Sequence, residues 1–481
     1  MRINNKGKII LGLLSFFLIT PLVVFYVLDG AGVFDTRSRA GTTEELPEAL
    51  KKADLNGDNK ITISDFGIWL SSYRDYKANP AAFAARADLN SDGAITIMDF
   101  SLWLNAYREF KGTNEPGSGG DLAGLVNYNW GNGSDGDFVV SGNVDIDAQT
   151  EKCTVGGFAP SYNVMSFASD GKSATVDSTP GTCLKAGDEV LVINVQGGGT
   201  YDNVGNHEIL KIDSVTGSTV KFTAAKVKFY GSSSGTDAGI GKGCGSQVVV
   251  MQRIPQFKNV TINADKTLSA KAWNGDKGGI VVFKASGTVN INGSISVAAD
   301  GFRGGLKNNT SGSSGEGMSS CSVASGIANF GGAAVGAFGG AYATRVDGTG
   351  PGLVYGVADL SKLYLGSGGS SVKRSGDRLS RAGGAGGGLV FILANDINVN
   401  GTINATGANG TVRNSTTQPR GAGSGGSVKL VGDNVVLGTN KILVNGGTTY
   451  GLGGTGRIAV YYSSVISGST TPSFYSKQFP K

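Results

Sequence analysis

Histidine and closely paired cysteines, on which many enzyme sites depend, are nearly missing from this sequence. One histidine, His207, occurs among 481 residues, and none of the four cysteines belongs to a C-x-x-C pair. A serine triad or a histidine-rich zinc site would have to rest on His207, which lies in no supporting motif. Thioredoxin-like redox chemistry would need a C-x-x-C pair. These classes of enzyme are therefore not expected.

The sequence also has no strong excess of basic or of acidic residues. The 42 lysines and arginines against 37 aspartates and glutamates give a net charge of +5, and no run of basic residues occurs. Nucleic-acid-binding domains usually carry such a run or a basic face, so no nucleic-acid partner is expected. Proline is scarce, with 11 residues, and the 79 glycines follow no three-residue period, which excludes collagen.

A long uncharged apolar run is found at the N-terminus. Three basic residues, Arg2, Lys6 and Lys8, precede the uncharged stretch Ile9–Leu28. At about 1.5 Å per residue this stretch is long enough to span a bilayer core. With the positive flank in the cytoplasm, we predict an uncleaved transmembrane signal-anchor over 1–29, a single-pass cell-membrane localisation and an extracellular bulk. A cleaved signal peptide, whose apolar core is usually about 7–15 residues, is the alternative.

The cysteines of an exported chain are normally oxidised. Four cysteines can form two disulfides in three different pairings, and the sequence alone cannot choose among them. Closeness along the chain favours the pairs Cys153–Cys183 and Cys244–Cys321. Four buried thiols are the alternative.

Two segments carry the spacing of calcium-binding loops. They read DLNGDNKITISD over Asp54–Asp65 and DLNSDGAITIMD over Asp88–Asp99. Loops of this kind supply oxygen ligands from positions 1, 3, 5, 7, 9 and 12. The sequence therefore predicts two Ca²⁺ ions. Their ligands, through the backbone carbonyl at position 7, are Asp54, Asn56, Asp58, Lys60, Thr62 and Asp65 in the first loop and Asp88, Asn90, Asp92, Ala94, Thr96 and Asp99 in the second.

Both loops lead into matching apolar phrases, FGIWLSSYR and FSLWLNAYR. The isoleucines at loop position 8, Ile61 and Ile95, are expected to join the loops through a shared core. Position 12 is Asp in both loops instead of the Glu of the usual EF-hand, and no EF-hand type of helix precedes the first loop. In these respects residues 46–110 resemble a dockerin module.

The dockerin resemblance implies a small all-α module, a duplicated loop–helix fold with pseudo-two-fold symmetry that orders on calcium binding. It also implies a cohesin-type protein as partner. Dockerin recognition uses loop positions 10 and 11 and the helix that follows, and here these positions hold Ile63-Ser64 and Ile97-Met98. A calcium-stiffened spacer is the alternative.

The helical pattern ends after residue 121, where short β-branched runs begin to alternate with Gly, Asn, Asp and Ser clusters, as in all-β regions. Gly278–Gly301 and Gly387–Gly410 are copies of one repeat with an Asn-Gly turn. A degenerate copy covers Gly425–Leu437, and Gly456–Tyr462 reads as a final half-rung. Such units bury their apolar stripes by stacking, which predicts a β-solenoid-like fold for the glycine-rich half. A sandwich or meander is the alternative.

Several phrases of this region, in this order, resemble a family of glycine-rich bacterial cell-surface proteins often described as adventurous-gliding-motility-like. The phrases include GDEVLVINVQG, QVVVMQRIPQFKNVTI, GGIVVFKASGTVNINGSISV, GGLVFILANDINVNGTINATG and GGTGRIAVYYSSVISGSTTPSFY. The resemblance implies exposure at the cell surface, with adhesion or contact to the cell envelope.

Glycan binding and glycan cleavage are the remaining hypotheses for the β region. Aromatic residues either contact sugars or fill gaps in the core; these are Tyr355, Tyr364, Tyr450, Tyr461 and Tyr462. A glycoside hydrolase or polysaccharide lyase on a β-solenoid would need paired carboxylates. The available carboxylates, all in turn-like sequence contexts, are Asp276, Asp300, Asp347 and Asp377. No catalytic residue is assigned.

The sequence as a whole predicts a multidomain, membrane-anchored surface protein, adhesive or structural, with a large all-β region. A carbohydrate-active protein with a dockerin module is the alternative. The expected partners are a cohesin-type protein or another cell-surface component, and glycans. The expected segments are an anchor at 1–29, a linker at 30–45, the calcium module at 46–110, a linker at 111–121, a β domain at 122–260 and a glycine-rich repeat β domain at 261–481.

Overall fold

The structure is a computed structural model that describes most of the chain after residue 50. The described residues are 51–79, 85–89, 93–95, 99, 103, 106–107, 129–148, 158–306, 313–319, 338–344, 354–371, 382–410, 421–448 and 451–480. The chain divides into two compact units, residues 1–123 and 124–481.

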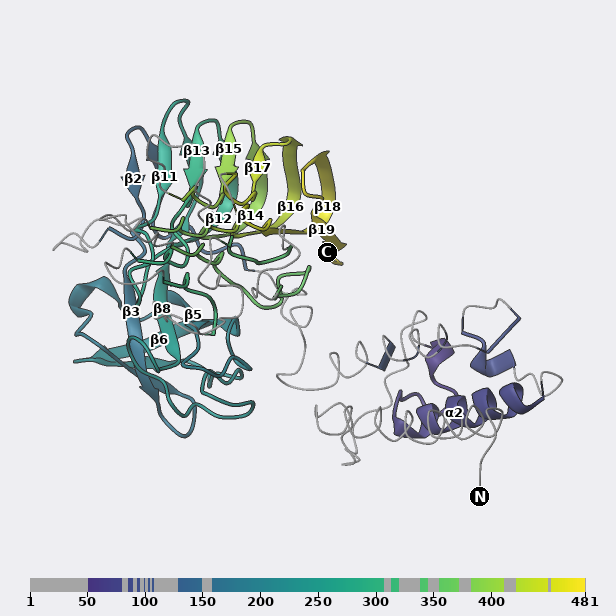
Figure 1. Ribbon diagram of the computed structural model, residues 1–481. Coiled ribbons are helices and arrows are strands. Elements are labelled where there is room, and N and C mark those ends of the chain that lie inside the picture. The colour runs from purple at the N-terminus through teal and green to yellow at the C-terminus, as the bar shows by residue number, and fades with distance from the viewer. Residues whose placement is uncertain are drawn as a thin grey trace, which may run out of the picture. The chain divides into compact units, whose positions relative to one another are not determined.

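The first unit contains the helix α2 (Ile63–Ala78) and two 3₁₀ turns, η1 (Lys51–Ala53) and η3 (Ala85–Ala87) (Figure 1). A capping box starts α2: the Ser64 N–H donates to the Thr62 hydroxyl, and the Thr62 N–H donates to Asp65. Such reciprocal bonds satisfy N–H groups that have no partner within the first helical turn. The sequence of the first loop therefore fixes where the helix begins.

One apolar core joins the two loop segments of this unit. Ile61 and Ile95 are 1% and 0% exposed, and both lie in the same cluster as Trp69 and Trp103. The ring centroids of Phe66 and Trp103 are 5.2 Å apart. The prediction that the two isoleucines join the loops through a shared core is confirmed.

The predicted fold class is wrong in its helical parts. The described chain is mostly β-structure, and α2 is the only α-helix whose two ends both lie within it, so a small all-α domain is not shown. Core residues of the first unit such as Ile61 and Ile95 come from loops, which is why buried apolar residues there do not require several helices.

The predicted membrane localisation is corrected as well. Among the described residues, no helix is long and apolar enough to cross a membrane. The structure therefore does not support the single-pass cell-membrane localisation. The stretch Ile9–Leu28, on which that prediction rested, lies outside the described residues.

Residues 161–254 of the second unit form a closed antiparallel barrel. Val249 and Met251 contribute to its core, while Gln252 donates to the carbonyl of Ile280 outside the barrel. The strands, in pairing order, are β3 (Ser161–Phe167), β4 (Ser173–Val176), β7 (Thr219–Phe222), β6 (His207–Thr216), β5 (Glu189–Gln196) and β8 (Val248–Ile254).

Two of the four cysteines, Cys183 and Cys244, are disulfide-bonded. The other two, Cys153 and Cys321, lie outside the described residues, so the predicted pairing stays a prediction.

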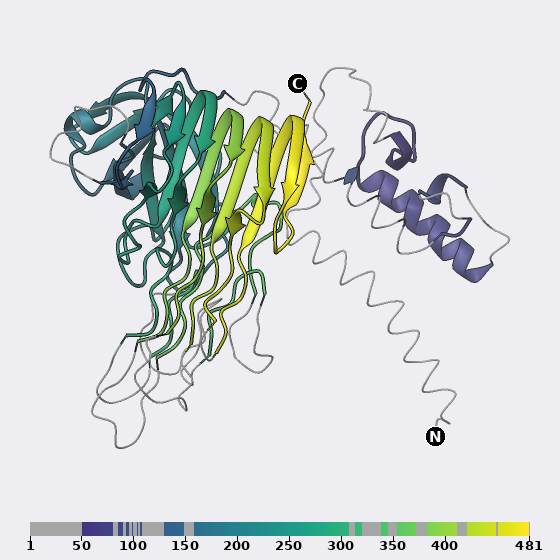
Figure 2. The ribbon, with the colours of Figure 1, turned by 90° about the horizontal axis from the view of Figure 1, so that it is seen from above.

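Two parallel sheets build a β-solenoid before and after the barrel in the chain (Figures 1 and 2). The larger sheet runs β1 (Phe138–Val140), β10 (Val260–Ile262), β12 (Ile280–Ile291), β14 (Leu389–Val399), β16 (Ser427–Thr439), β18 (Arg457–Ser469) and β19 (Tyr475–Gln478), with β9 (Gln256–Phe257) also beside β12. The smaller sheet runs β17 (Ile442–Leu443), β15 (Thr402–Asn404), β13 (Ser294–Ser296), β11 (Thr267–Ser269) and β2 (Val144–Asp145).

The repeat copies stack in register, as the sequence predicts. Ile280 pairs with Leu389, Leu389 with Ser427, and Ser427 with Arg457. Apolar residues from both sheets share one core, so each rung buries its stripe against its neighbours. The expected half-rung that begins at Gly456 is longer than predicted, because β18 continues to Ser469.

The described parts of the glycine-rich segments that leave the strands also pack side by side, and among them no sheet is formed (Figure 2). Gly301 donates its N–H to the Gly386 carbonyl at 2.7 Å. A Cβ at Gly386 would lie 2.0 Å from the Gly366 oxygen, and one at Gly423 would lie 1.9 Å from the Ala385 oxygen. These positions require glycine because neighbouring backbones touch there. The high glycine content thus builds a dense bundle of backbone.

Buried ion pairs connect the barrel to the solenoid. Arg253 Nη2 on β8 lies 2.9 Å from Asp135 and 3.0 Å from Asp188, and all three side chains are under 10% exposed. Lys284 on β12 lies 2.7 Å from Glu189 on β5. Charges taken out of water are stable only when they are paired in this way. The pairs therefore hold the two parts together at a fixed geometry.

Candidate functional site

The first predicted calcium loop is wound around its own acidic and amide side chains. Asp54 accepts hydrogen bonds from the N–H groups of Gly57 at 2.8 Å and Asp58 at 3.2 Å through Oδ1, and from Asn59 at 2.8 Å through Oδ2. Asn59, at position 6, has a positive φ of 61°, a conformation that Asn tolerates better than most residues. Position 1 therefore fixes the first half of the loop.

Positions 3, 5 and 7 continue this pattern. Asn56 Oδ1 accepts from the Asp58 N–H at 2.9 Å, and Asn56 Nδ2 donates to Asp58 Oδ2 at 3.0 Å. Asp58 Oδ1 accepts from the Lys60 N–H at 2.9 Å. These short-range bonds make the side chains of positions 1, 3 and 5 part of one compact turn.

Position 12 closes the loop. Asp65 Oδ1 accepts from the Leu55 N–H at 2.8 Å and the Asn56 N–H at 3.1 Å, and its Oδ2 accepts from the Thr62 N–H at 2.7 Å. Asp65 is fully buried. Burial raises the pKa of its carboxyl, these N–H groups lower that pKa, and the nearby Asp54 carboxylate raises it. A cation between two such carboxylates would offset their repulsion.

The second loop repeats two hydrogen bonds of the first, those from the backbone N–H groups at loop positions 6 and 2. Asp88 accepts from the Gly93 N–H at 2.8 Å, as Asp54 does from Asn59, and Asp99 accepts from the Leu89 N–H at 2.8 Å, as Asp65 does from Leu55. Gly93 has a φ of 84°. Ala94 is described, whereas the predicted ligands Asn90, Asp92 and Thr96 lie outside the described residues.

The donor chemistry of both loops fits a hard cation. Every predicted ligand atom is an oxygen of a carboxylate, an amide, a hydroxyl or a backbone carbonyl, and oxygen is what Ca²⁺ prefers. Among the described residues, however, no three His, Cys, Asp or Glu side chains are grouped as metal ligands. The carboxylates of loop one are instead bonded to backbone N–H groups. Calcium binding and the dockerin likeness therefore stay predictions.

The carboxylates considered for glycan chemistry fall into different surroundings. Asp276 accepts from the Gly243 N–H at 2.8 Å, and Asp347 and Asp377 lie outside the described residues. Asp300 follows β13 and lies near Asp145 and Asp147. Sequence spacing could not show this last grouping, because Asp300 is far along the chain from the other two.

The surroundings of Asp300 and Asp147 raise the pKa of both carboxyl groups. Burial, with the charges of Asp145 and Asp147, raises the pKa of Asp300 to about 7. Burial also raises the pKa of Asp147 to about 6, against hydrogen bonds that include the Lys271 N–H at 2.7 Å. Raised carboxyl pKa values occur in general acids and also in purely structural clusters.

The histidine and the candidate tyrosines that the structure describes are buried or half-buried. His207 is 7% exposed, its Nδ1 lies 3.1 Å from the Gly205 carbonyl, and its ring meets Phe391 edge-on. Tyr355 and Tyr364 are each 6% exposed, with ring centroids 5.3 Å apart. Of the remaining candidates for sugar contact, Tyr461 is also buried, Tyr462 packs partly buried against the core and Tyr450 lies outside the described residues.

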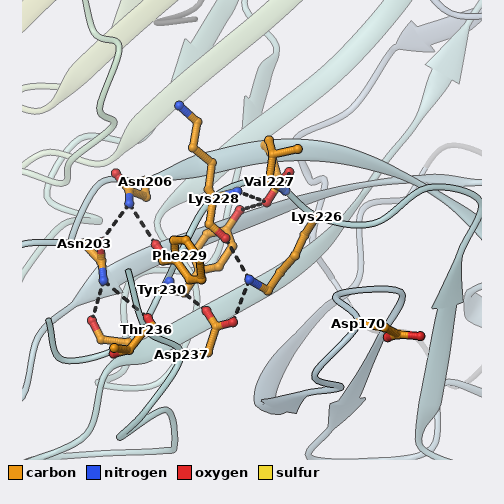
Figure 3. A network of polar contacts seen from close by, with 12 residues as sticks. Asp170, Asn203, Asn206, Lys226, Val227, Lys228, Phe229, Tyr230, Thr236 and Asp237 are labelled. Carbon is orange, nitrogen blue, oxygen red and sulfur yellow. Dashed lines mark hydrogen bonds and ion pairs between the residues drawn. The ribbon is translucent and has the colours of Figure 1, made fainter. Parts of the chain in front are cut away.

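A polar network on the barrel was not anticipated from the sequence (Figure 3). Glu208 on β6 accepts from the Tyr230 hydroxyl at 2.8 Å, and Lys226 pairs with Asp237 at 2.6 Å. Asn203 donates from Nδ2 to the carbonyls of Gly231 at 2.9 Å and Ser233 at 2.6 Å. Because these residues share no motif, only the fold brings them together.

No protein-family model and no curated protein sequence matches the chain. Among solved structures, the tailspike gp61 of Pseudomonas phage phi297 is similar at 13% identity and a TM-score of 0.18, over 69% of this chain and 39% of that one. The tailspike gp54 of Acinetobacter baumannii bacteriophage AP22, solved in complex with A. baumannii capsular saccharide, is similar at 11% identity and a TM-score of 0.16, over 64% and 44%.

The tailspike gp49 of Pseudomonas phage LKA1 is similar at 11% identity and a TM-score of 0.14, over 64% of this chain and 61% of that one. The chain thus spans less than two thirds of the length of each of these proteins. At such TM-scores, the likeness supports no conclusion about what this chain does.

Proposed function

We propose that the β region is a rigid adhesive or structural module of a surface protein that contacts glycans without cleaving them. The observation that carries the proposal is the in-register stack of β12, β14, β16 and β18, joined to the barrel by the buried Arg253 ion pairs. Such a stack buries its apolar faces internally and presents a fixed outer surface. The lone, buried His207 adds no acid–base group to that surface.

Binding to polysaccharides tests this proposal. The purified full chain should bind at least one polysaccharide from a panel of neutral and acidic polymers immobilised on a sensor surface. Heat-unfolded protein serves as the control, because the binding surface requires the folded stack. Absence of binding to every polymer in the panel would refute the glycan part of the proposal.

We further propose that residues 46–110 bind two Ca²⁺ ions as a dockerin-like module. The support is the repetition of the same two hydrogen bonds, from positions 2 and 6, in both loops. A cohesin-type protein is the partner that the likeness suggests, and a calcium-stiffened spacer is the alternative. Binding of the full chain to a cohesin in calcium, lost in a chelator, would distinguish the two.

Calorimetry tests the calcium proposal itself. The full chain should bind two Ca²⁺, and Asp54→Asn with Asp65→Asn should bind one fewer, because both charged ends of loop one are removed. Asp75→Asn, a change at an exposed position of α2, should still bind two. Calcium binding that is absent from the unchanged chain, or that is equal in all three proteins, would contradict this assignment.

Glycan cleavage is a second candidate function, favoured by one observation. Asp300 has a raised pKa of about 7 and lies beside Asp145 and Asp147, and a protonated acid next to a carboxylate is the pairing that glycoside hydrolysis uses. Cleavage that is lost in Asp300→Asn, with the fold intact, would establish this function instead of pure adhesion.

A further inference from the structure

The loop after β7 presents apolar side chains to solvent. Along residues 226–230, Lys226 and Tyr230 point inward, whereas Val227 and Phe229 are 53% and 44% exposed. The Lys226 Nζ lies 5.0 Å from the ring centre of Phe167 and 4.8 Å from that of Phe229. A cation held over aromatic faces is stabilised by their quadrupoles. The inner side of the loop is therefore well anchored.

The backbone of this loop is fixed as firmly as its inner side chains (Figure 3). Glu208 accepts from the Val227 N–H at 2.9 Å and the Lys228 N–H at 3.2 Å. Asn206 donates to the Phe229 carbonyl at 2.8 Å, and Lys226 Nζ donates to the Lys228 carbonyl at 2.9 Å. A single exposed apolar residue is ordinary, but here a network of hydrogen bonds holds two of them in one orientation. Such preorganisation lowers the entropy lost on binding a ligand.

Positive charge lies beside these apolar groups. The Lys228 side chain points away from the network (Figure 3), while the carboxylates of Glu208 and Asp237 are bonded within it. The segment containing Lys362 is adjacent, because the Leu363 N–H donates to the carbonyl of Gly205, next to Asn206.

The Lys362 ammonium donates to the carbonyl of Asp202 at 2.5 Å, in the segment that leads to Asn206. Burial lowers the pKa of Lys362, the exposed Asp202 raises it, and the Lys228 ammonium lowers it again. An anion bound there would offset the repulsion between the two ammonium groups.

We propose that Val227, Lys228 and Phe229, with Lys362 beside them, form a binding site for an acidic sugar unit of an anionic polysaccharide. This inference rests on the proposed glycan binding and names the site and the ligand class. The ring would cover the apolar C–H face of the sugar, and the ammonium groups would face its carboxylate. A protein partner is less well matched, because a stable protein interface needs about 800 Å² per partner and this loop offers two exposed apolar side chains.

Affinity electrophoresis of the full chain tests the site, with polygalacturonate as the acidic polymer and dextran as the neutral one. Phe229→Ala and Lys228→Gln should each weaken retardation by polygalacturonate roughly five-fold, the effect of losing an anchor of modest strength. Phe229→Tyr should keep the binding, since it keeps the ring. Lys221→Gln, an exposed lysine on the neighbouring β7, is the matched control and should bind unchanged.

The outcomes separate this site from the broader proposal. Unchanged polygalacturonate binding in Phe229→Ala and Lys228→Gln would overturn the site but leave glycan binding in place. A wild-type chain that binds no polysaccharide would overturn both. Equal retardation by dextran would overturn the acidic-ligand assignment, and binding to polyglutamate or anionic lipid vesicles but not to polygalacturonate would assign the loop to another partner. If Phe229→Ala melts early, Lys228→Gln alone decides.

Discussion

Two kinds of residue account for much of the behaviour expected of the β region: glycines at backbone contacts and buried carboxylates. Both are common in loops, so their roles are visible only in the fold. A glycine in the bundle differs from one in a turn because its missing Cβ leaves space for another backbone. An aspartate that lies close to other carboxylates and away from water differs from a solvated one, because its charged form is less stable there than in water.

Replacing a contact glycine should destabilise the protein strongly. A Cβ at Gly423 would lie 1.9 Å from the carbonyl oxygen of Ala385, so Gly423→Ala should force backbone apart and cost at least about 1–3 kcal/mol of unfolding free energy. Gly142→Ala is the control, because nothing lies within 4 Å of its added Cβ. Chemical denaturation compares the two, and equal midpoints would show that the bundle is not tightly packed.

The carboxylate group should make stability depend on pH. The pKa of Asp300 is raised to about 7 in the folded chain, whereas an unfolded aspartate titrates near 4. The folded state thus holds its proton more tightly, so this contribution is fully present below about pH 4 and is lost as the pH rises to about 7.

Asp300→Asn should therefore raise the melting temperature at pH 8. The melting temperature of this variant should also decrease less than that of the wild type between pH 4 and pH 7. The expected change in the free energy of unfolding is on the order of 1 kcal/mol after allowance for solvent screening. Asp170→Asn, at an exposed turn, should leave the pH profile unchanged. Thermal melts across pH 4–8 measure this, and a mutant profile parallel to the wild type would contradict the assigned environment.

At the scale of the element, the sequence predicts the repeated strands of the solenoid better than its first rungs, the barrel or the glycine bundle. The Asn-rich strands could be recognised because they recur in register: Asn398 donates to Asn290, and Asn400 to Asn292, each at 3.0 Å. The first rungs, β1 and β10, have three residues each and carry no such repeat, so the sequence does not distinguish them from other short β-branched runs.

The barrel and the glycine bundle show why the rest could not be predicted. Barrel closure depends on pairing β3 with β8, which are far apart in the chain, and no local pattern encodes such a partner. The bundle depends on contacts between glycines that have no side chains to show a periodicity. The predicted helical module failed as a fold class because apolar loop residues such as Ile61 and Ile95 can fill a core without belonging to helices.

At the scale of the whole β region, the barrel and the solenoid should unfold together. Arg253→Ala would leave Asp135 and Asp188 buried without their partner, and such a loss typically costs about 3–5 kcal/mol. Lys242→Ala, which removes a pair whose lysine is 43% exposed, should cost under about 1 kcal/mol. Calorimetry should show a lower transition only for Arg253→Ala, and matching transitions in both variants would argue against a structural joint.

The central claim is that this surface holds glycans without breaking them. The most direct measurement incubates the full chain with each polysaccharide it binds and follows the release of new reducing ends and the fall in polymer length. Because the proposal gives the stacked surface a binding role and the single histidine is buried, we expect bound polymer of unchanged length. Shortened polymer, with cleavage abolished by Asp300→Asn in a protein that still folds and binds, would contradict the account.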